Sequence, residues 1–192
     1  MEEKFDKYKY VSEIITEQEA RLCAGAFLIA EDQGKLQEDK QQVEGSTIAH
    51  GHELADALML KCLPRMEEET GLSLIPTYAF FRIYRKGMDL KKHTDRPSCE
   101  VSVTINLSYV DVDIWPIYAD GAQICLMTGD GLIYRGCDVE HWRDPLPSGC
   151  CVQIFLHYVD ANGPHAEHAL DKRKDKIPLY QAVGAHVIHA DS

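Results

Sequence analysis

The stretch KKHTDRPSCEVSVTINLSY, residues 91–109, decides the fold. Its second half alternates between apolar and polar side chains, which is the period of a β-strand. The apolar set is Val101, Val103, Ile105 and Leu107, and the polar set is Ser102, Thr104, Asn106 and Ser108. The apolar face therefore packs on a core, while the polar face either meets water on a one-sided sheet or lines a wet cavity inside a barrel.

The same period of two continues on both sides of this stretch. Further strand candidates are PTYAFFRIY (76–84), QICLMT (123–128), GLIYRG (131–136) and CCVQIFLHYVD (150–160). Turn residues separate them at Lys86-Gly87, Asp120-Gly121, Gly129-Asp130-Gly131 and Pro147-Ser148-Gly149. Many short strands with turns between them predict an antiparallel sandwich or barrel.

The residues before the strands carry a helical period. The segment 15–36 predicts a helix, with Thr16 and Glu19 forming a capping box. The segment 52–71 predicts a second helix that ends at Gly71, with Pro64 kinking or restarting it. Between them, the polar residues 31–46 predict an exposed loop in which a short strand is possible.

Helices followed by strands indicate the α+β class. We expect one domain over residues 1–192. Its parts are a helical support (12–71), a barrel core (74–160) and a polar tail (161–192) in which no clear element is predicted.

Composition narrows the class of protein. The 192 residues carry a formal net charge of −11, which disfavours nonspecific binding to nucleic acid or to anionic membranes. No apolar run reaches membrane-spanning length, and the first ten residues, MEEKFDKYKY, lack the apolar core of a signal peptide. The seven cysteines form no CxxC pair. We therefore expect reduced thiols and a cytoplasmic location.

The pair His93 and Asp95 is the first candidate for chemistry. Residues two apart on a strand point to the same side, so both side chains can bind one cation. A second histidine, His141, follows the strand candidate at 131–136. Two histidines and one carboxylate form a facial triad, which leaves coordination positions open and suits ferrous iron. Alone, a His-x-Asp sequence also occurs in solvated turns.

Four segments carry a resemblance to a known family. They are RIYRKGMDLKKHTD (82–95), SVTINLSY (102–109), GDGLIYRGCDVEHWRDPLPSG (129–149) and VQIFLHYVD (152–160). Together they resemble the iron(II)- and 2-oxoglutarate-dependent dioxygenases, in the prolyl 4-hydroxylase-like branch, over roughly residues 75–160. The resemblance implies a double-stranded β-helix (jelly-roll) barrel with supporting N-terminal helices.

The resemblance also implies a reaction. Residues His93, Asp95 and His141 would be the catalytic triad that binds Fe(II), with 2-oxoglutarate and O₂ as cosubstrates. The family oxidises an unactivated C–H bond of a small-molecule, amino-acid or peptide substrate. A carboxylate at Asp95 fills the coordination position that halogenating relatives leave open for chloride, which favours hydroxylation.

One position departs from the family pattern. The basic residue that usually pairs with the far carboxylate of 2-oxoglutarate is replaced by Cys151. The first candidate substitute is Arg143, which has the same strand parity as His141, although Arg143 could equally pair with an acidic neighbour at the surface. The second candidate is Arg82. By the resemblance, Tyr84 and Asn106 would also contact the cosubstrate, although both could simply pack within the sheet.

Two other functions remain open. A cupin-like sensor or binding protein would keep the barrel and the metal without turnover, and the cysteine at position 151 favours it. An interaction domain would bind no metal. Other histidine pairs have no third ligand nearby and are expected in loops or on the surface: His50/His52, His165/His168 and His186/His189. His157, on the last strand, is expected to be a hydrogen-bonded core histidine that could also line the pocket.

Overall fold

Two antiparallel sheets and two helices form the part of the chain that the computed structural model describes, residues 5–173. The elements are β1 (Tyr8–Val11), α1 (Glu17–Asp32), β2 (Gln37–Glu38), β3 (Thr47–His50), α2 (Glu53–Thr70), β4 (Leu74–Arg85), β5 (Leu90–His93), η1 (Pro97–Cys99), β6 (Val101–Val110), β7 (Ile117–Ala119), β8 (Ala122–Ile124), β9 (Gly131–Tyr134), β10 (His141–Arg143), β11 (Cys150–Asp160) and η2 (Ala166–Lys172).

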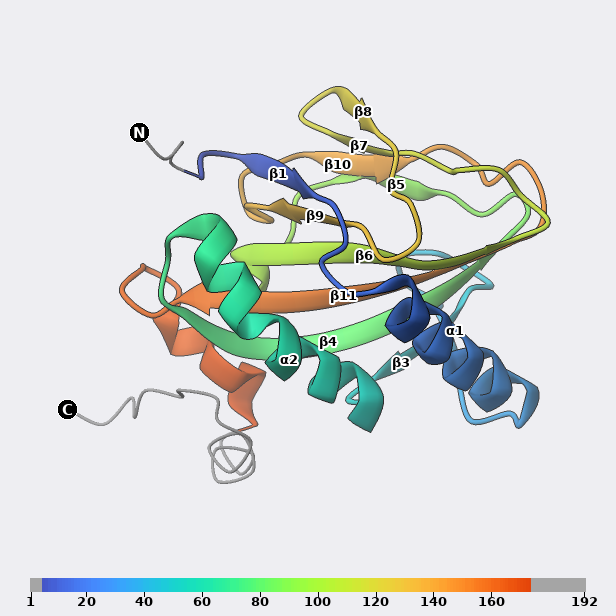
Figure 1. The fold of residues 1–192 in the computed structure, drawn as a ribbon, viewed down its shortest axis with the longest axis horizontal. Coiled ribbons are helices and arrows are strands. Elements are labelled where there is room, and N and C mark those ends of the chain that lie inside the picture. Colours follow the sequence, from blue (N-terminus) through green and yellow to red (C-terminus); the bar gives the residue numbers. More distant parts are fainter. Residues whose placement is uncertain (1–4, 174–192) are drawn as a thin grey trace.

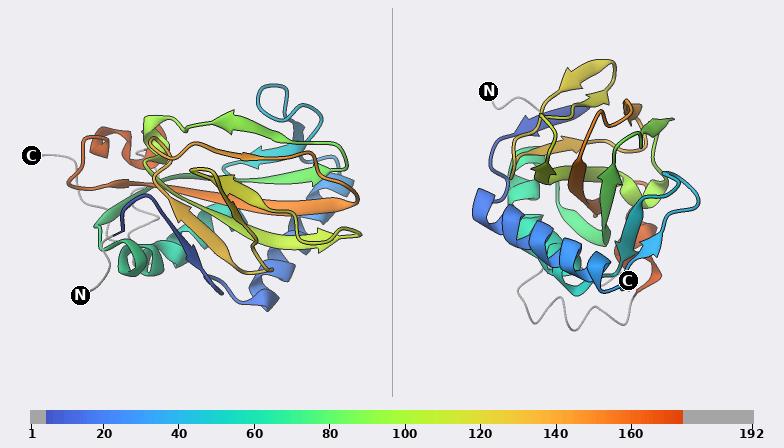
Figure 2. Two further views of the ribbon diagram at one scale, coloured as in Figure 1. Left: turned by 90° about the horizontal axis from the view of Figure 1, so that it is seen from above. Right: turned by 90° about the vertical axis from the view of Figure 1, so that its right-hand side faces the viewer.

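The larger sheet has the strand order β1-β9-β6-β11-β4-β3-β2, and the smaller sheet has the order β5-β10-β7-β8. The smaller sheet lies over one face of the larger sheet, and α1 and α2 lie against its other face (Figures 1 and 2). This is the predicted α+β arrangement of helices packed on an antiparallel sandwich. No helix within residues 5–173 is both long enough and apolar enough to cross a bilayer.

Both predicted helices are present. Helix α1 begins after the Thr16 cap, whose hydroxyl accepts from the Glu19 amide while the Glu19 side chain accepts from the Thr16 amide. It packs on the sheet through Phe27, whose ring stacks on Phe81 at a centroid distance of 3.5 Å. Helix α2 is tied to β11 by the Tyr158 hydroxyl, which donates to a carbonyl of α2.

The two faces of β6 have separate roles. Its apolar side chains belong to the core cluster that also contains residues of α1 and α2. Its polar side chains Ser102, Thr104 and Asn106 are fully buried on the opposite face, between the two sheets. The polar face of β6 therefore lines the interior of the sandwich and does not face solvent, and the candidate site lies in this interior.

Three local predictions differ from the structure. Helix α2 continues through Pro64 without restarting, because a row of buried side chains on both sides of the proline holds it against the sheet. The segment 31–46 is not wholly exposed, since Asp39 and Val43 are buried. The tail contains the short 3₁₀ helix η2, and the histidines at 186 and 189 lie outside the described residues.

Candidate metal centre

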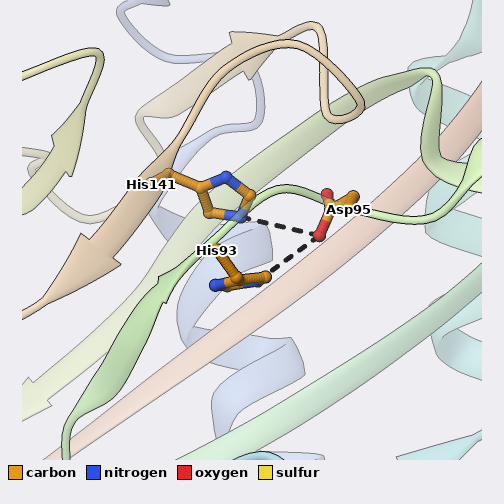
Figure 3. Close-up of side chains that lie close together, drawn as sticks. All are labelled: His93, Asp95 and His141. Carbon is orange, nitrogen blue, oxygen red and sulfur yellow. Dashed lines mark ion pairs between the residues drawn. The ribbon is translucent and has the colours of Figure 1, made fainter.

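Three side chains from two neighbouring strands meet inside the sandwich. Strands β5 and β10 pair antiparallel with His93 directly opposite His141, which brings the two imidazole centroids to 4.3 Å. Asp95 follows β5, and its Oδ1 lies 3.5 Å from His93 Nε2 and 3.6 Å from His141 Nε2 (Figure 3). The sheet register therefore brings together the three residues that were predicted from the sequence.

Backbone carbonyls fix the tautomer of both histidines. His93 Nδ1 lies 2.7 Å from the Lys91 carbonyl oxygen, and His141 Nδ1 lies 2.9 Å from the Val139 carbonyl oxygen. Because a carbonyl oxygen only accepts, each Nδ1 carries the proton and each Nε2 presents a bare lone pair. Imidazoles that bind metals are commonly oriented by such a carbonyl contact.

The pKa shifts of Asp95 and His141 favour the protonation states that bind a cation. Burial alone raises the pKa of Asp95, but hydrogen bonding to His93 and the nearby imidazoles outweigh burial and leave its pKa below the ordinary value. Burial lowers the pKa of His141 by more than Asp95 raises it. At His93, burial lowers the pKa, but the Asp95 and Lys91 contacts outweigh it, so the pKa is raised. An ionised carboxylate thus lies beside a neutral imidazole.

The donor set fits a divalent metal ion. One ligand atom from each of His93, Asp95 and His141 lies within 4.8 Å of the others. The second carboxylate oxygen, Asp95 Oδ2, is buried and has no hydrogen-bond partner in the described part of the chain. Two imidazole nitrogens and one carboxylate on one side of an ion are the donors that non-haem iron takes.

A small cavity of about 70 Å³ opens onto these three residues. The rest of its wall consists of Gln42, Tyr78, Phe80, Arg82, Leu90, Tyr134, Phe155 and His157. The wall is therefore largely aromatic, with one cation and one amide. A larger surface hollow of about 550 Å³, between β1 and the end of α2, contains none of the three residues, so the smaller cavity is the one that bears on chemistry.

Arg82 lies in the cavity wall, but its charge is already compensated. Its guanidinium donates to Asp39 Oδ2 at 2.6 Å and to Gln42 Oε1 at 2.9 Å, and both charged side chains are buried. It also donates to the Tyr84 hydroxyl at 3.2 Å. The Gln42 side-chain amide lies 3.0 Å from His93 Nε2 and donates to its lone pair. The segment after β2 therefore covers the cavity, a contact that the sequence did not indicate.

Arg143 is the opposite case, a buried cation without a buried anion. It points into the sandwich, where it donates to the Trp115 carbonyl at 2.7 Å and to Gln153 Oε1 at 3.3 Å. Its guanidinium lies over the Trp115 ring, and no carboxylate of residues 5–173 pairs with it. The alternative that Arg143 pairs with an acidic neighbour at the surface is wrong, because only 1% of Arg143 is exposed.

Asn106 and Cys151 belong to the same polar network as Arg143. Gln153 donates to Asn106 Oδ1 at 2.8 Å, and Cys151 Sγ lies 3.6 Å from the same oxygen. Two donors here, Asn106 Nδ2 and Arg143 Nε, are buried without a partner in the described residues. Unpaired buried donors beside a cation without a paired carboxylate are groups that a bound anion would satisfy. Gln153 was missed from the sequence, although it shares the strand face of Cys151.

The remaining histidines have separate places. His52 caps α2 by accepting from the Leu54 amide, and His50 stacks on Phe80. The ring centroids of His165, which precedes η2, and His168, within it, lie 6.2 Å apart. His157 lies in the cavity wall, and its Nε2 has no partner among the described residues, so it is not the fully hydrogen-bonded core histidine that was expected.

No family model and no curated protein sequence matches the chain. Solved structures do match it. A prolyl-4-hydroxylase from Pseudomonas putida has a TM-score of 0.65 at 14% identity, covering 80% of this chain and 92% of that one. A prolyl hydroxylase from Trichoplax adhaerens, in complex with a hypoxia inducible factor peptide, has a TM-score of 0.63 at 12% identity, with 93% and 87% covered.

A third similar structure is the non-haem α-ketoglutarate-dependent epimerase SnoN from nogalamycin biosynthesis, with a TM-score of 0.67 at 12% identity and coverage of 81% and 78%. At these identities the likeness shows a shared fold. The expectation of a jelly-roll barrel with supporting helices is therefore confirmed.

Proposed function

We propose that the protein is an Fe(II)- and 2-oxoglutarate-dependent oxygenase that hydroxylates an unactivated C–H bond. The observation that carries the proposal is the convergence of two bare imidazole nitrogens and one ionised carboxylate on a cavity inside this fold. Similar structures include a viral prolyl hydroxylase complexed with 2-oxoglutarate and the protein HygX with nickel and 2-oxoglutarate bound.

In this proposal His93, Asp95 and His141 hold the iron and leave its other positions free for cosubstrates. Iron bound there would supply the oxidation, in which one oxygen atom of O₂ enters succinate, formed from 2-oxoglutarate with release of CO₂, and the other enters the substrate C–H bond as a hydroxyl group. The protein orients the ligands, since the carbonyls of Lys91 and Val139 hold both imidazoles in the binding tautomer. Aromatic rings of Tyr78, Phe80, Tyr134 and Phe155 form much of the wall around this centre.

The far carboxylate of 2-oxoglutarate is assigned to the network of Arg143. Arg143 offers a buried positive charge without a counter-ion, and Asn106 offers an unpaired amide donor. Tyr84, which is fully buried beside Trp115, is the third residue that would contact the far carboxylate. A charge-assisted contact from Arg143 would replace the one that Cys151 is unable to make. Arg82 is the less favoured candidate because Asp39 already neutralises it.

The substrate class follows from the cavity and from the neighbours. The small volume of about 70 Å³ and the rings of Tyr78, Phe80 and Phe155 suit an extended side chain better than a bulky polycycle. Among the similar proteins, one is complexed with a peptide fragment and another, SnoN, with nogalamycin RO. We propose an amino-acid or peptide side chain as the substrate, hydroxylated at carbon.

The decisive experiment measures conversion of 2-oxoglutarate to succinate, with Fe(II) and O₂ supplied. In His93→Ala and Asp95→Ala this conversion is expected to be lost, because each variant removes one of three metal ligands, while the circular dichroism spectrum stays that of the folded protein. A matched control is Asp120→Ala, which removes an exposed carboxylate on a neighbouring hairpin. Undiminished conversion in the two ligand variants would remove the proposal.

A metal-binding sensor is the second candidate, and the thiol at Cys151 favours it. Anaerobic titration with Fe(II) and then 2-oxoglutarate separates the two functions. A visible charge-transfer band from chelated 2-oxoglutarate supports the oxygenase. Stoichiometric iron binding without that band supports the sensor.

A further inference from the structure

A second group of potential metal ligands lies on the other side of Asp95. One ligand atom from each of Asp95, Cys99 and His157 lies within 4.8 Å of the others. Cys99 is in η1 and His157 in β11, and neither side chain belongs to the triad. Both are buried, with exposed fractions of 2% and 3%. The triad alone does not account for this grouping.

The tautomer of His157 follows from its neighbours. The Ser102 hydroxyl donates its one proton to the Cys99 carbonyl at 3.1 Å. Its oxygen lies 2.7 Å from His157 Nδ1, so it accepts there, and Nδ1 carries the proton. His157 Nε2 is therefore a bare lone pair. It is buried and has no partner within the described part of the chain.

Only one of the two carboxylate oxygens of Asp95 contacts the triad histidines. Its Oδ1 faces the two triad imidazoles, whereas Oδ2 is buried and unpartnered among residues 5–173. Near this oxygen lie two further groups that can give up a lone pair, His157 and Cys99. Two of these groups, Asp95 Oδ2 and His157 Nε2, are buried lone pairs without a donor in the described residues, which is costly. A bound cation would satisfy both lone pairs and take the Cys99 sulfur as a third ligand, whereas a trapped water would satisfy the two lone pairs alone.

The ligand types point to the kind of cation. One sulfur, one imidazole and one carboxylate are the donors of zinc sites that keep an open position, whereas Mg²⁺ and Ca²⁺ prefer oxygen alone. The Tyr78 hydroxyl lies 3.1 Å from Cys99 Sγ and is placed to donate to a thiolate. Burial raises the pKa of the free Cys99 thiol to about 12. Binding therefore releases the thiol proton to solvent, as coordination to Zn²⁺ does.

We propose that Asp95, Cys99 and His157 form a second cation site, selective for a thiophilic divalent ion such as Zn²⁺. The site shares Asp95 with the triad but does not depend on iron or 2-oxoglutarate. Two dications on one carboxylate repel each other, so filling this site weakens metal binding at the triad. Zinc would then act as an antagonist of the proposed oxygenase.

Cobalt(II) is the probe, because only a site with sulfur gives a near-ultraviolet sulfur-to-cobalt charge-transfer band. The titration uses the His93→Ala/His141→Ala double variant, in which the triad is dismantled and Asp95 remains. We expect the band to saturate at one equivalent. Adding Cys99→Ser should abolish it, and adding His157→Phe should weaken binding at least tenfold. Adding Cys137→Ser, at a half-buried thiol near the site, should leave the band unchanged.

Two results would overturn the proposal. One is a folded double variant that shows no sulfur-to-cobalt band. In that case a trapped water, and not a metal ion, would occupy the space between Asp95 and His157. The other is a band that survives Cys99→Ser. If the double variant does not fold, the wild-type chain serves instead, and the band is expected with the second equivalent of cobalt. Conversion of 2-oxoglutarate tests the triad separately, so failure of either proposal is distinguishable.

Discussion

Arg143 shows at the scale of one residue why a departure from the family pattern need not abolish function. Arg143 is 1% exposed, and the hydrogen-bond partners of its guanidinium among residues 5–173 are neutral oxygens. That arrangement is costly unless an anion arrives, because isolated charges are stabilised poorly away from water. Under the proposed function, Arg143 on β10 would supply the positive charge that Cys151 on β11 lacks.

Arg143→Gln tests this assignment. A hydrogen bond to a charged group contributes about 1.5–3 kcal/mol, so the affinity for 2-oxoglutarate should fall about 10- to 100-fold. Fe(II) binding should not change, because the triad does not contact Arg143. Anaerobic titration of the iron-loaded protein with 2-oxoglutarate measures both. Arg21→Gln, at an exposed position of α1, is the control. An unchanged affinity for 2-oxoglutarate would show that Arg143 does not pair with the far carboxylate and would leave Arg82 as the candidate.

The sequence predicted part of the site for a physical reason. His93 ends β5 and Asp95 lies two residues further on, so extending the strand parity of β5 was enough to predict that both lie on one side. His141 required the family resemblance, because antiparallel pairing of β5 with β10 is not written in local periodicity. The contacts of Asp39 and Gln42 with Arg82 were missed altogether. They depend on how a polar segment folds back over the sheet, and no repeat in the sequence encodes that path.

The turn between β9 and β10 is the element on which the position of Asp95 depends. The Asp95 amide donates to the Gly136 carbonyl at 2.8 Å. A Cβ added at Gly136 would lie 2.2 Å from the Cys99 carbonyl oxygen and 2.7 Å from Asp95 Oδ2. Since real contacts are never that short, either the turn or the carboxylate must move.

We therefore expect Gly136→Ala to weaken metal binding about 10- to 100-fold, the range seen when groups that orient a ligand are altered. Isothermal titration with Ni²⁺ would measure it. Gly25→Ala is the matched control, because a Cβ at that position of α1 meets no atom within 4 Å. Replacing a helical glycine with alanine there should stabilise the protein by up to about 1 kcal/mol. Equal nickel affinities for both variants would contradict the role given to this turn.

At the scale of helices and strands, the sequence was most informative where one local rule acts alone. The capping box of Thr16 and Glu19 and the left-handed cap at Gly71 were both predicted and are both present. The restart predicted at Pro64 does not occur, because the local rule for proline competes with tertiary packing. Buried residues on either side of it, including Cys62 and Met66, hold α2 on the sheet.

The whole molecule separates stability from chemistry across the larger sheet. Helices α1 and α2 pack on one of its faces, and the candidate site lies on the other (Figure 1). The alternation of apolar and polar residues in β6 predicted that one face of the sheet packs on a core and the other is polar, because successive side chains point to opposite faces. The order of the strands was not predictable from local pattern, because it depends on pairings between segments far apart in the chain.

Phe27→Ala tests the separation. Removing this fully buried ring from its stack on Phe81 should destabilise the protein by about 3–5 kcal/mol. Denaturant unfolding measures that loss. Metal affinity of the folded protein, measured well below the melting temperature, should stay within about twofold of the wild type because no contact of the site is removed. The control is Leu22→Ala on the same helix, where the side chain is 70% exposed. A large loss of metal affinity in Phe27→Ala would show that the two faces are coupled.

The buried Asp39 carboxylate links the loop after β2 to Arg82 in the cavity wall. It accepts from the amides of Gln41, Gln42 and Val43 while it pairs with Arg82. An incoming anion that draws Arg82 away, or a cation that displaces Gln42 from His93, removes one of the anchors of this segment. The three amides would then exchange with deuterium faster, and the exchange rate of this short peptide would report occupancy without any catalytic assay.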